Sequence, residues 1–298
     1  MTPAAAGSPR RTRPGRMRRV RRVGQVRAAV AAWRSRGESV GFVPTMGAIH
    51  PGHLSLIERA RGTDDRVVAS IFVNPLQFGP GEDFRSYPRP VVRDRRMLAA
   101  AGTDLLWEPE VRDVYPPGDR TRVRVEGLSE GLEGASRPGH FEGVATVVLR
   151  LLHVVQPDTL WLGQKDAQQA RILEQMVRDL HVPVRVRRAP TARESDGLAR
   201  SSRNAYLDAT QRAQAVALAR GLAAARSALA GGEHSAERLR RAIRAVWRSF
   251  PAVREDYVAV VDADTLEPVT RVRGRVLVAV AARVGRARLI DNFEWQPA

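Results

Sequence analysis

The chain has 298 residues, 43% of them hydrophobic, with 49 lysine or arginine residues, 32 aspartate or glutamate residues and no cysteine. The length allows a large core and favours two domains, while the missing cysteine excludes disulfides, thiolate zinc sites and a cysteine nucleophile. No apolar run approaches the roughly 18 residues that a transmembrane helix needs, so no membrane partner is expected.

The net charge of +17 is distributed unevenly. Residues 1–22 carry eight arginines and no acidic residue, which leaves +9 for the other 276 residues. We interpret this stretch as a basic, disordered tail, because no aromatic residue is interleaved for base stacking. An arm that binds RNA or a membrane and a transit peptide are the alternatives. No apolar segment follows the arginines, so a secretory signal is not indicated and a cytoplasmic location is expected.

Strand-like and helix-like segments alternate over the first two thirds of the chain. This alternation predicts βαβ units with right-handed crossovers, and therefore an α/β fold with a parallel sheet. The predicted strands are 40–43 (ended by Pro44), 66–73, 104–107, 121–125, 159–162 and 182–186. The predicted helices are 23–36, 51–62, 90–101, 141–156 and 167–180, and the glycine-rich segment 127–139 is expected to be a mobile loop.

The pattern changes after Pro190, where we place a domain boundary. A polar segment over 191–205 precedes predicted helices at 209–230 and 234–249, which Gly231 and Gly232 separate. Alternating segments at 256–262, 275–283 and 286–293 predict the strands of a small α+β domain.

A histidine pair lies where the first strand passes into a helix, in His50-Pro51-Gly52-His53. Pro51 suits the first turn of a helix. In an open parallel sheet this is where ligands bind and where free backbone N–H groups attract phosphate. Gly52 would let a phosphate approach the backbone, and the imidazoles could donate hydrogen bonds to an α-phosphate. Half of a zinc site, without an evident third ligand, and two capping histidines are the alternatives.

Two further segments could complete a nucleotide site. Lys165, the only lysine among 49 basic residues, follows a predicted strand together with Asp166. A lysine there could neutralise phosphate oxygens and Asp166 could accept from ribose hydroxyls, although coding bias and an ordinary surface pair would also explain them. Ser201, Ser202 and Arg203 could clamp the β- and γ-phosphates. A Walker A sequence and a G-x-G-x-x-G motif are absent, which disfavours a P-loop ATPase and a dinucleotide fingerprint.

The chain resembles the pantothenate synthetases (pantoate–β-alanine ligases), a family of HIGH-signature nucleotidyltransferases. The resemblance covers residues 23–298 and is carried by 44–53, 71–78, 137–144, 163–169 and 196–204. It implies a Rossmann-like domain over 23–190, which binds nucleotide and pantoate, and a smaller C-terminal α+β lid over 191–298. It also implies a homodimer that uses Mg²⁺ and ATP. No acidic cluster with dedicated spacing stands out in the sequence, so Mg²⁺ is expected to bind through the ATP phosphates without dedicated metal ligands. Aromatic and basic residues are hardly interleaved, so no nucleic-acid partner is expected.

By this resemblance, pantoate attacks the α-phosphate of ATP to give pantoyl adenylate and pyrophosphate, and β-alanine then displaces AMP. The implied catalytic residues are His50, His53 and Lys165, with His53 as the proton donor. The implied pantoate-binding residues are Asn74, Gln77, Tyr87 and Gln169. The implied ATP-binding residues are Met46, Gly47, Ala48, Ile49, His50, Pro51, Gly52, His53, Gly163, Gln164, Lys165, Asp166, Ala192, Arg200, Ser201, Ser202 and Arg203.

The sequence departs from the family pattern at Gln164, Ala167, Ala192 and Arg200, where Glu, an aromatic residue, an aliphatic residue and Met or Leu are common. We expect modest changes in ATP affinity from these departures. Two other functions stay open at this stage. One is a nucleotidylyltransferase that stops at the adenylylated product, and the other is a basic RNA-binding protein whose binding would fall steeply with salt.

Overall fold

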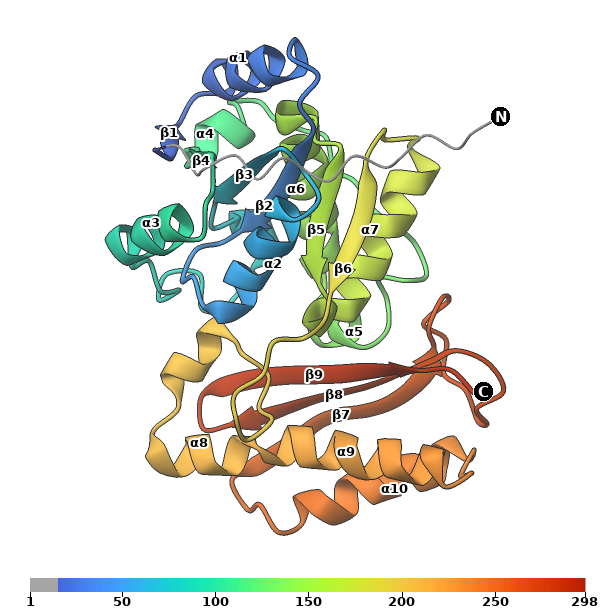
Figure 1. Ribbon diagram of the computed structural model, residues 1–298. Coiled ribbons are helices and arrows are strands. Elements are labelled where there is room, and N and C mark those ends of the chain that lie inside the picture. The colour runs from blue at the N-terminus through green and yellow to red at the C-terminus, as the bar shows by residue number, and fades with distance from the viewer. Residues whose placement is uncertain (1–15, 298) are drawn as a thin grey trace, which may run out of the picture.

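The computed structural model describes residues 16–297. Its larger sheet has six parallel strands in the order β1-β4-β3-β2-β5-β6 (Figure 1). The strands are β1 (Arg18–Val20), β2 (Val40–Thr45), β3 (Arg66–Ile71), β4 (Leu105–Trp107), β5 (Thr159–Gly163) and β6 (Arg185–Ala189). The order reverses between β2 and β5, which makes their carboxyl ends the topological switch point where such sheets bind ligands.

Helices cover both faces of this sheet, as its apolar strands require. They are α1 (Val23–Arg34), α2 (Pro51–Arg61), α3 (Val91–Ala100), α4 (Val111–Val114), α5 (Glu133–Ser136), α6 (His140–Val155) and α7 (Ala167–Asp179). Alternate strand residues face opposite sides, as the pleat dictates. Phe42, Leu105 and Leu160 share a core with α1, α6 and α7, whereas Val43, Leu106 and Trp161 share one with α2 and α3. The fold class predicted for this part of the chain is confirmed.

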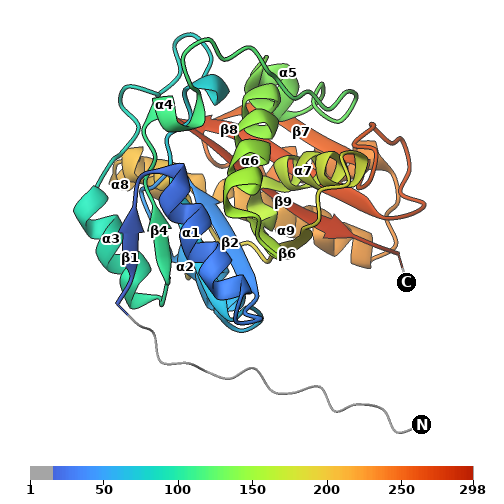
Figure 2. The same ribbon diagram turned by 90° about the horizontal axis from the view of Figure 1, so that it is seen from above.

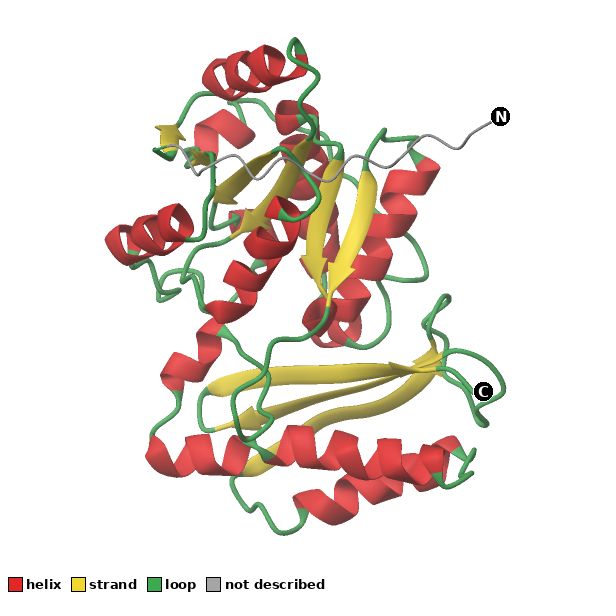
Figure 3. Ribbon diagram, viewed as in Figure 1, coloured by secondary structure: helices red, strands yellow, loops and turns green. Residues whose placement is uncertain are grey.

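The C-terminal part is a three-stranded antiparallel sheet with helices on one side (Figure 3). Its elements are α8 (Ala209–Ala215), α9 (Ala217–Ala230), α10 (Ala236–Trp247), β7 (Val253–Asp262), β8 (Val276–Val284) and β9 (Ala287–Trp295). Val278 and Val280 pack toward α9 and α10, while Leu277 and Ala279 belong to the core of the parallel-sheet part. The small sheet therefore lies across the lower end of the parallel sheet, as Figure 1 shows. We keep the domain boundary near residue 190 as a proposal.

A glycine-rich segment links the two parts. Gln168 on α7 donates to the carbonyls of Leu128 and Gly131, both at 2.9 Å. The buried carboxylate of Glu133 then accepts from the Tyr257 hydroxyl at 2.9 Å and from the Arg288 guanidinium at 2.9 Å. Segment 127–139 thus connects α7 to β7 and β9.

Several predicted boundaries were wrong. β2 continues through Pro44, which is tolerated because β5 pairs only with Gly41 and Phe42, so no N–H is required of the proline. The predicted strand at 121–125 is an extended segment outside both sheets, and the predicted strand at 182–186 lies three residues later as β6. The predicted helix at 209–230 is two helices that meet at Val216.

The basic tail is also shorter than expected. Arg18–Val20 forms strand β1 on β4, and Val20 is buried. The indole N–H of Trp107 donates to the Arg21 carbonyl at 2.9 Å, and Arg22 pairs with Asp113 at 2.9 Å. Residues 18–22 therefore belong to the fold, and Met17 packs against its core. Residues 1–15 of the predicted tail lie outside the described residues. Across residues 16–297, every helix is too short or too polar to span a bilayer.

Candidate active site

The turn after β2 has unusual backbone conformations. A carboxylate that is distant in the sequence stabilises them. Gly47 and Ala48 have φ of +84° and +48°, a region that glycine adopts at little cost. The buried Asp94 accepts from the backbone N–H groups of Ala48 and Ile49, both at 2.8 Å. Burial raises the pKa of Asp94 although these two hydrogen bonds oppose the change. The N–H groups of Ala48 and Ile49 are therefore bound by Asp94 and are not free for phosphate.

The two histidines lie at the start of α2, one turn apart. Their ring centroids are 4.0 Å apart. Burial, and then the charge of Lys165, lowers the pKa of His50 to about 4, and burial lowers that of His53 to about 3. Both rings are therefore neutral at pH 7. Nδ1 of His50 accepts from the Gly52 N–H at 3.1 Å, so the proton of the neutral ring is on Nε2. His50 is thus a neutral hydrogen-bond donor.

This contact changes the expected role of Gly52. Its N–H is already bound to His50, and a Cβ added at Gly52 would lie 2.8 Å from Cε1 and 2.9 Å from Nδ1 of that ring. The glycine makes room for the imidazole and does not offer a free N–H to phosphate. Gly52→Ala should therefore displace His50 and slow the chemistry at this site about 10-fold or more, with a melting temperature close to that of the wild type. Steady-state rates and thermal unfolding measured on one preparation test this, and an unchanged rate would contradict it.

Low histidine pKa values also make stability depend on pH. His140 is buried, and burial lowers its pKa to about 4, as it also lowers those of His50 and His53. An unfolded histidine takes up its proton near pH 6.5, whereas these three do so only near pH 3–4. Their neutral forms thus stabilise the fold above about pH 6.5, and this stability is lost as the pH falls toward 4. The free energy of unfolding measured with urea should be lower at pH 5 than at pH 7. His53→Ala should make this difference smaller.

Lys165 and Asp166 follow β5 in a short 3-10 turn. The ammonium of Lys165 is 3.3 Å from a carboxylate oxygen of Asp166. Burial would raise the pKa of Asp166, but Lys165 holds it below its usual range. Asn292 on β9 donates to the Lys165 carbonyl at 2.7 Å, so the C-terminal sheet fixes the backbone that carries the lysine.

The serine pair lies in the chain between the two parts. Ser202 Oγ donates to the Ala48 carbonyl at 3.2 Å, which joins this segment to the turn before α2. Ser201 Oγ accepts from the Arg203 N–H at 3.2 Å, and Arg203 pairs with Asp83 at 3.0 Å. Two serine hydroxyls and a guanidinium therefore lie beside the histidine turn.

These three segments line one cavity of about 240 Å³ at the switch point between β2 and β5. The predicted residues that line it are Met46, His50, Gly52, His53, Asn74, Gln77, Tyr87, Gly163, Lys165, Asp166, Gln169, Ala192, Arg200, Ser201, Ser202 and Arg203. The other predicted residues, Gly47, Ala48, Ile49, Pro51 and Gln164, do not line it. The side chain of Ile49 is in the core and that of Gln164 donates to Glu294 at 3.1 Å.

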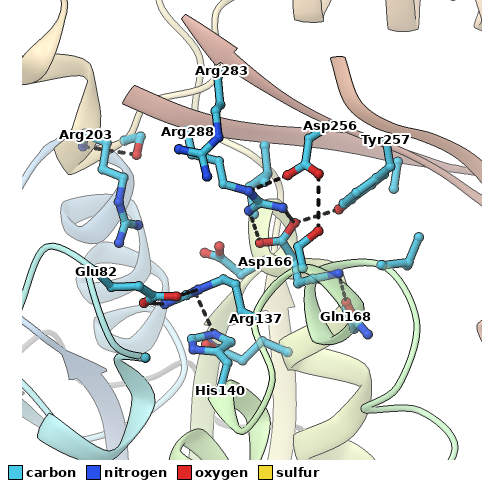
Figure 4. Close-up of a pocket in the computed structure, with 18 of the residues that line it drawn as sticks. Glu82, Arg137, His140, Asp166, Gln168, Arg203, Asp256, Tyr257, Arg283 and Arg288 are labelled. Atoms are coloured by element: carbon cyan, nitrogen blue, oxygen red, sulfur yellow. Dashed lines mark hydrogen bonds and ion pairs between the residues drawn. The ribbon is translucent and has the colours of Figure 1, made fainter. Parts of the chain in front are cut away.

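A second cavity of about 880 Å³ opens beside the first, between the parallel sheet and the C-terminal sheet (Figure 4). Both cavities share seven residues, namely Arg137, His140, Lys165, Asp166, Gln169, Ser201 and Arg203. A ligand too long for the inner cavity can therefore extend past these residues into the outer one. Seen along the perpendicular direction in Figure 2, the C-terminal strands pass beneath the parallel-sheet part.

The sequence assigned no role to Arg137 and His140, which line both cavities. Arg137 Nε donates to Glu82 at 2.8 Å, and Arg137 Nη1 donates to Nε2 of His140 at 3.1 Å. Nδ1–H of His140 therefore donates to the Gln77 carbonyl, at 2.8 Å. The pair could have been found from its position in the segment 137–144, which was already among those that carry the resemblance. Asp256, Tyr257, Arg283 and Arg288 of the outer cavity had no comparable signal.

Within residues 16–297, no group of three or more histidine or acidic residues is placed to hold a metal ion, which removes the basis for a zinc site at the histidine pair. The arrangement offers two neutral imidazoles, one ammonium, two hydroxyls and several amides around one cavity. Such a site can orient a polyanion and neutralise charge that develops on it, and it contains no cysteine for covalent catalysis.

Comparison with known proteins gives consistent results. The family model for pantoate-beta-alanine ligase matches residues 18–294. A pantothenate synthetase from Moorella thermoacetica is 53% identical over 270 residues, which covers 91% of this chain and 95% of the relative.

Solved structures agree. A crystal structure of pantothenate synthetase from Thermus thermophilus has a TM-score of 0.90 and 51% identity, covering 94% of this chain and 100% of that one. The ligase from Francisella tularensis, crystallised with beta-gamma ATP and beta-alanine, has a TM-score of 0.76 and 33% identity over 93% of this chain and 97% of its own.

Proposed function

This chain belongs to the pantoate–β-alanine ligase family, and from that premise we propose that the inner cavity is where its reaction takes place. The enzyme condenses pantoate with β-alanine at the expense of ATP, through a pantoyl adenylate, and releases AMP and pyrophosphate. The observation that supports this placement is the meeting of the histidine pair, Lys165 and the serine pair around one cavity at the switch point.

Two displacements make up the reaction. A carboxylate oxygen of pantoate bonds to the α-phosphorus of ATP while the bond to the β-phosphate oxygen breaks, which releases pyrophosphate. The amine nitrogen of β-alanine then bonds to the acyl carbon and loses a proton, and the acyl carbon–oxygen bond breaks, which releases AMP. The substrate acid is the nucleophile in the first step, so the protein only has to position groups and stabilise charge.

We assign the groups by their position. The neutral imidazoles of His50 and His53 face the α-phosphate, and Lys165 offsets the charge that develops there. Gln77 and Gln169 hold pantoate in the inner cavity, with Tyr87 beside it. The inner volume of about 240 Å³ is below the 300–1,000 Å³ of common ligand pockets, so the triphosphate has to pass into the outer cavity. Ser201 and Arg203 line both cavities and Ser202 lines the inner one, and we assign the outer phosphates to these three residues.

We assign the nucleoside end to the part of the inner cavity farthest from the phosphate residues. Gly163, Ala192 and Arg200 line the inner cavity and not the outer one, which supports this assignment. The guanidinium of Arg200 pairs with Glu194 at 2.9 Å, so the arginine that departs from the family pattern is neutralised within its own loop. Asp166 is the acceptor offered to ribose hydroxyls.

We further propose Mg²⁺ as the counter-ion of the ATP phosphates, a homodimer and a cytoplasmic location. Magnesium keeps most of its water and is commonly bound through substrate phosphates, which suits a site without an acidic cluster in the described part of the chain. When bound, the ion would reduce the charge of the triphosphate. The family resemblance supports the dimer, and the requirement for ATP supports the location.

A coupled assay tests the function. With pantoate, ATP and Mg²⁺ but no β-alanine, the enzyme should exchange labelled pyrophosphate into ATP and form little AMP. Adding β-alanine should release AMP in a one-to-one ratio with pantothenate. AMP release that does not depend on the amine, or exchange that does not depend on pantoate, would contradict the proposal.

A further inference from the structure

A chain of side-chain hydrogen bonds leads from Tyr115, next to α4, to Gln77 in the inner cavity. The Tyr115 hydroxyl donates to Asn74 Oδ1 at 2.7 Å. Asn74 Nδ2 in turn donates to Gln77 Oε1 at 3.1 Å. Asn74 is 1% exposed and Gln77 is 8% exposed, so water does not compete freely for these groups.

The orientation of the Asn74 amide follows from its backbone partners. Its Oδ1 also accepts from the Leu76 N–H at 3.3 Å, and an N–H can only donate. Its Nδ2 also donates to the Gly143 carbonyl at 3.0 Å, and a carbonyl can only accept. A flipped amide would place donor against donor and acceptor against acceptor.

All the hydrogen-bonding capacity of Asn74 is therefore used within the protein. Two donors reach its oxygen and two acceptors receive its two protons, which is the full number for an amide. Asn74 lines the cavity but has no polar group left for a ligand. It acts through Gln77 and not on the substrate.

The same logic fixes Gln77. Its Oε1 is bound by Asn74, so its Nε2 is the polar group left for the cavity. The described partner of that nitrogen is the thioether of Met46 at 3.0 Å, a weak acceptor that a carboxylate would readily replace. The backbone of Gln77 is held as well, because its carbonyl accepts from His140 at 2.8 Å and from Arg137 at 3.2 Å. Gly143 packs closely against it, since a Cβ there would lie 2.7 Å from the Gln77 nitrogen.

We propose that Tyr115 and Asn74 are positioning residues that fix the amide of Gln77 so that its nitrogen, and not its oxygen, faces the bound acid. This inference rests on the proposed function, because it takes pantoate as the ligand of the inner cavity. A fixed donor favours an acceptor such as a carboxylate oxygen over a hydroxyl that needs an acceptor. Tyr115 thereby determines which kind of oxygen Gln77 recognises, although it does not line that cavity.

Gln77→Glu tests the direction of the amide, since it keeps the shape and replaces the donor with an anion. If the nitrogen faces the acid, KM for pantoate should rise at least about 10-fold at pH 8 while KM for ATP stays within about twofold. Lowering the pH should restore part of the affinity, because the introduced carboxyl group donates again once it is protonated. A pantoate KM within about threefold of the wild type at pH 8 would overturn the proposal, as would a defect that does not depend on pH.

Tyr115→Phe and Asn74→Asp test whether these two residues act through Gln77. Tyr115→Phe should raise KM for pantoate severalfold with a smaller change in kcat. Asn74→Asp should raise it further, because the new acceptor would turn the Gln77 amide over. Combined with Gln77→Glu, Tyr115→Phe should add less than its single effect, since it acts through residue 77. Additive effects would show that Tyr115 does not act through Gln77.

The matched control is Gln175→Glu, which adds the same charge on α7 outside both cavities and should leave both KM values unchanged. Pantoate-dependent exchange by the wild type separates the two levels of the argument. If the wild type lacks this exchange, the proposed function fails. If the wild type shows pantoate-dependent exchange of pyrophosphate and Gln77→Glu binds pantoate normally, only the proposed positioning of Gln77 fails.

Discussion

His53→Ala is expected to slow formation of the adenylate by more than about 10²-fold, the usual effect of removing one group that stabilises developing charge. The imidazole lines the inner cavity beside His50 and is neutral at pH 7, so it can donate a hydrogen bond to the α-phosphate without carrying a charge. Single-turnover measurements with pantoate and ATP give the rate of this step. The amine step, measured with preformed pantoyl adenylate, should change much less.

The control for this variant is His153→Ala, which removes an exposed histidine from α6 and should leave both steps unchanged. The pH profile gives a second check. Because the pKa values of His50 and His53 are about 4 and about 3, the adenylation rate should show no step near pH 6.5 that depends on either residue. A variant slowed only in the amine step would contradict the role given to His53.

Lys165→Ala is expected to have an effect of similar size on the same half-reaction. The ammonium lies where the inner and outer cavities join and is the only lysine of the chain. Lys165→Arg should restore little of the rate, because a planar guanidinium carries the charge on a larger group that does not replace a compact ammonium. Single-turnover adenylation and KM for ATP measure the loss. Full activity of Lys165→Arg would show that only the charge at this place matters.

Lys165→Ala also has a structural control. The carbonyl of Lys165 accepts from Asn292, a contact that the alanine variant keeps. The melting temperature of Lys165→Ala should therefore stay close to that of the wild type. If Lys165→Ala does not fold, Lys165→Met replaces it as the test of the catalytic role, because methionine preserves the apolar stem of the side chain.

The part of the site that the sequence predicts well depends on local chain direction. Pro51 begins α2 and His50 caps it, so the histidine pair had to lie at a carboxyl end of the sheet. Lys165 follows β5 directly in the same way. Parallel strands bring such ends together whatever the loops between them do, so the sequence predicts that these two segments meet at one cavity. The serine pair follows no strand directly, and its position near the predicted domain boundary is what pointed to the same cavity.

The features that could not be predicted depend on partners far away in the chain. β6 was placed too early because Arg185 to Arg188 look like surface residues, yet Arg188 is tied to Glu174 and, at 2.7 Å, to Glu294. Strand β1 could not be predicted for a similar reason. Its arginines look like surface residues, and its partner strand β4 comes much later in the chain. Hydropathy alone does not record such ion pairs and edge pairings.

The sequence also does not indicate which polar groups already make all their hydrogen bonds within the protein. The family resemblance implied that Asn74 binds pantoate, and Gly52 was expected to let a phosphate approach the backbone. In the structure the four bonds of Asn74 and the one bond of Gly52 are already made within the protein. Only the positions of donors and acceptors in space distinguish a residue that binds a ligand from one that positions its neighbour.

The central claim is that the substrate acid, held among these three segments, attacks the α-phosphorus itself. Pantoate labelled with ¹⁸O in both carboxylate oxygens, turned over with ATP and β-alanine, tests it most directly by mass spectrometry of the products. One ¹⁸O should appear in the phosphate of each AMP, one should remain in the amide carbonyl of pantothenate, and none should appear in pyrophosphate. Unlabelled AMP, or ¹⁸O in pyrophosphate or inorganic phosphate, would contradict the claim.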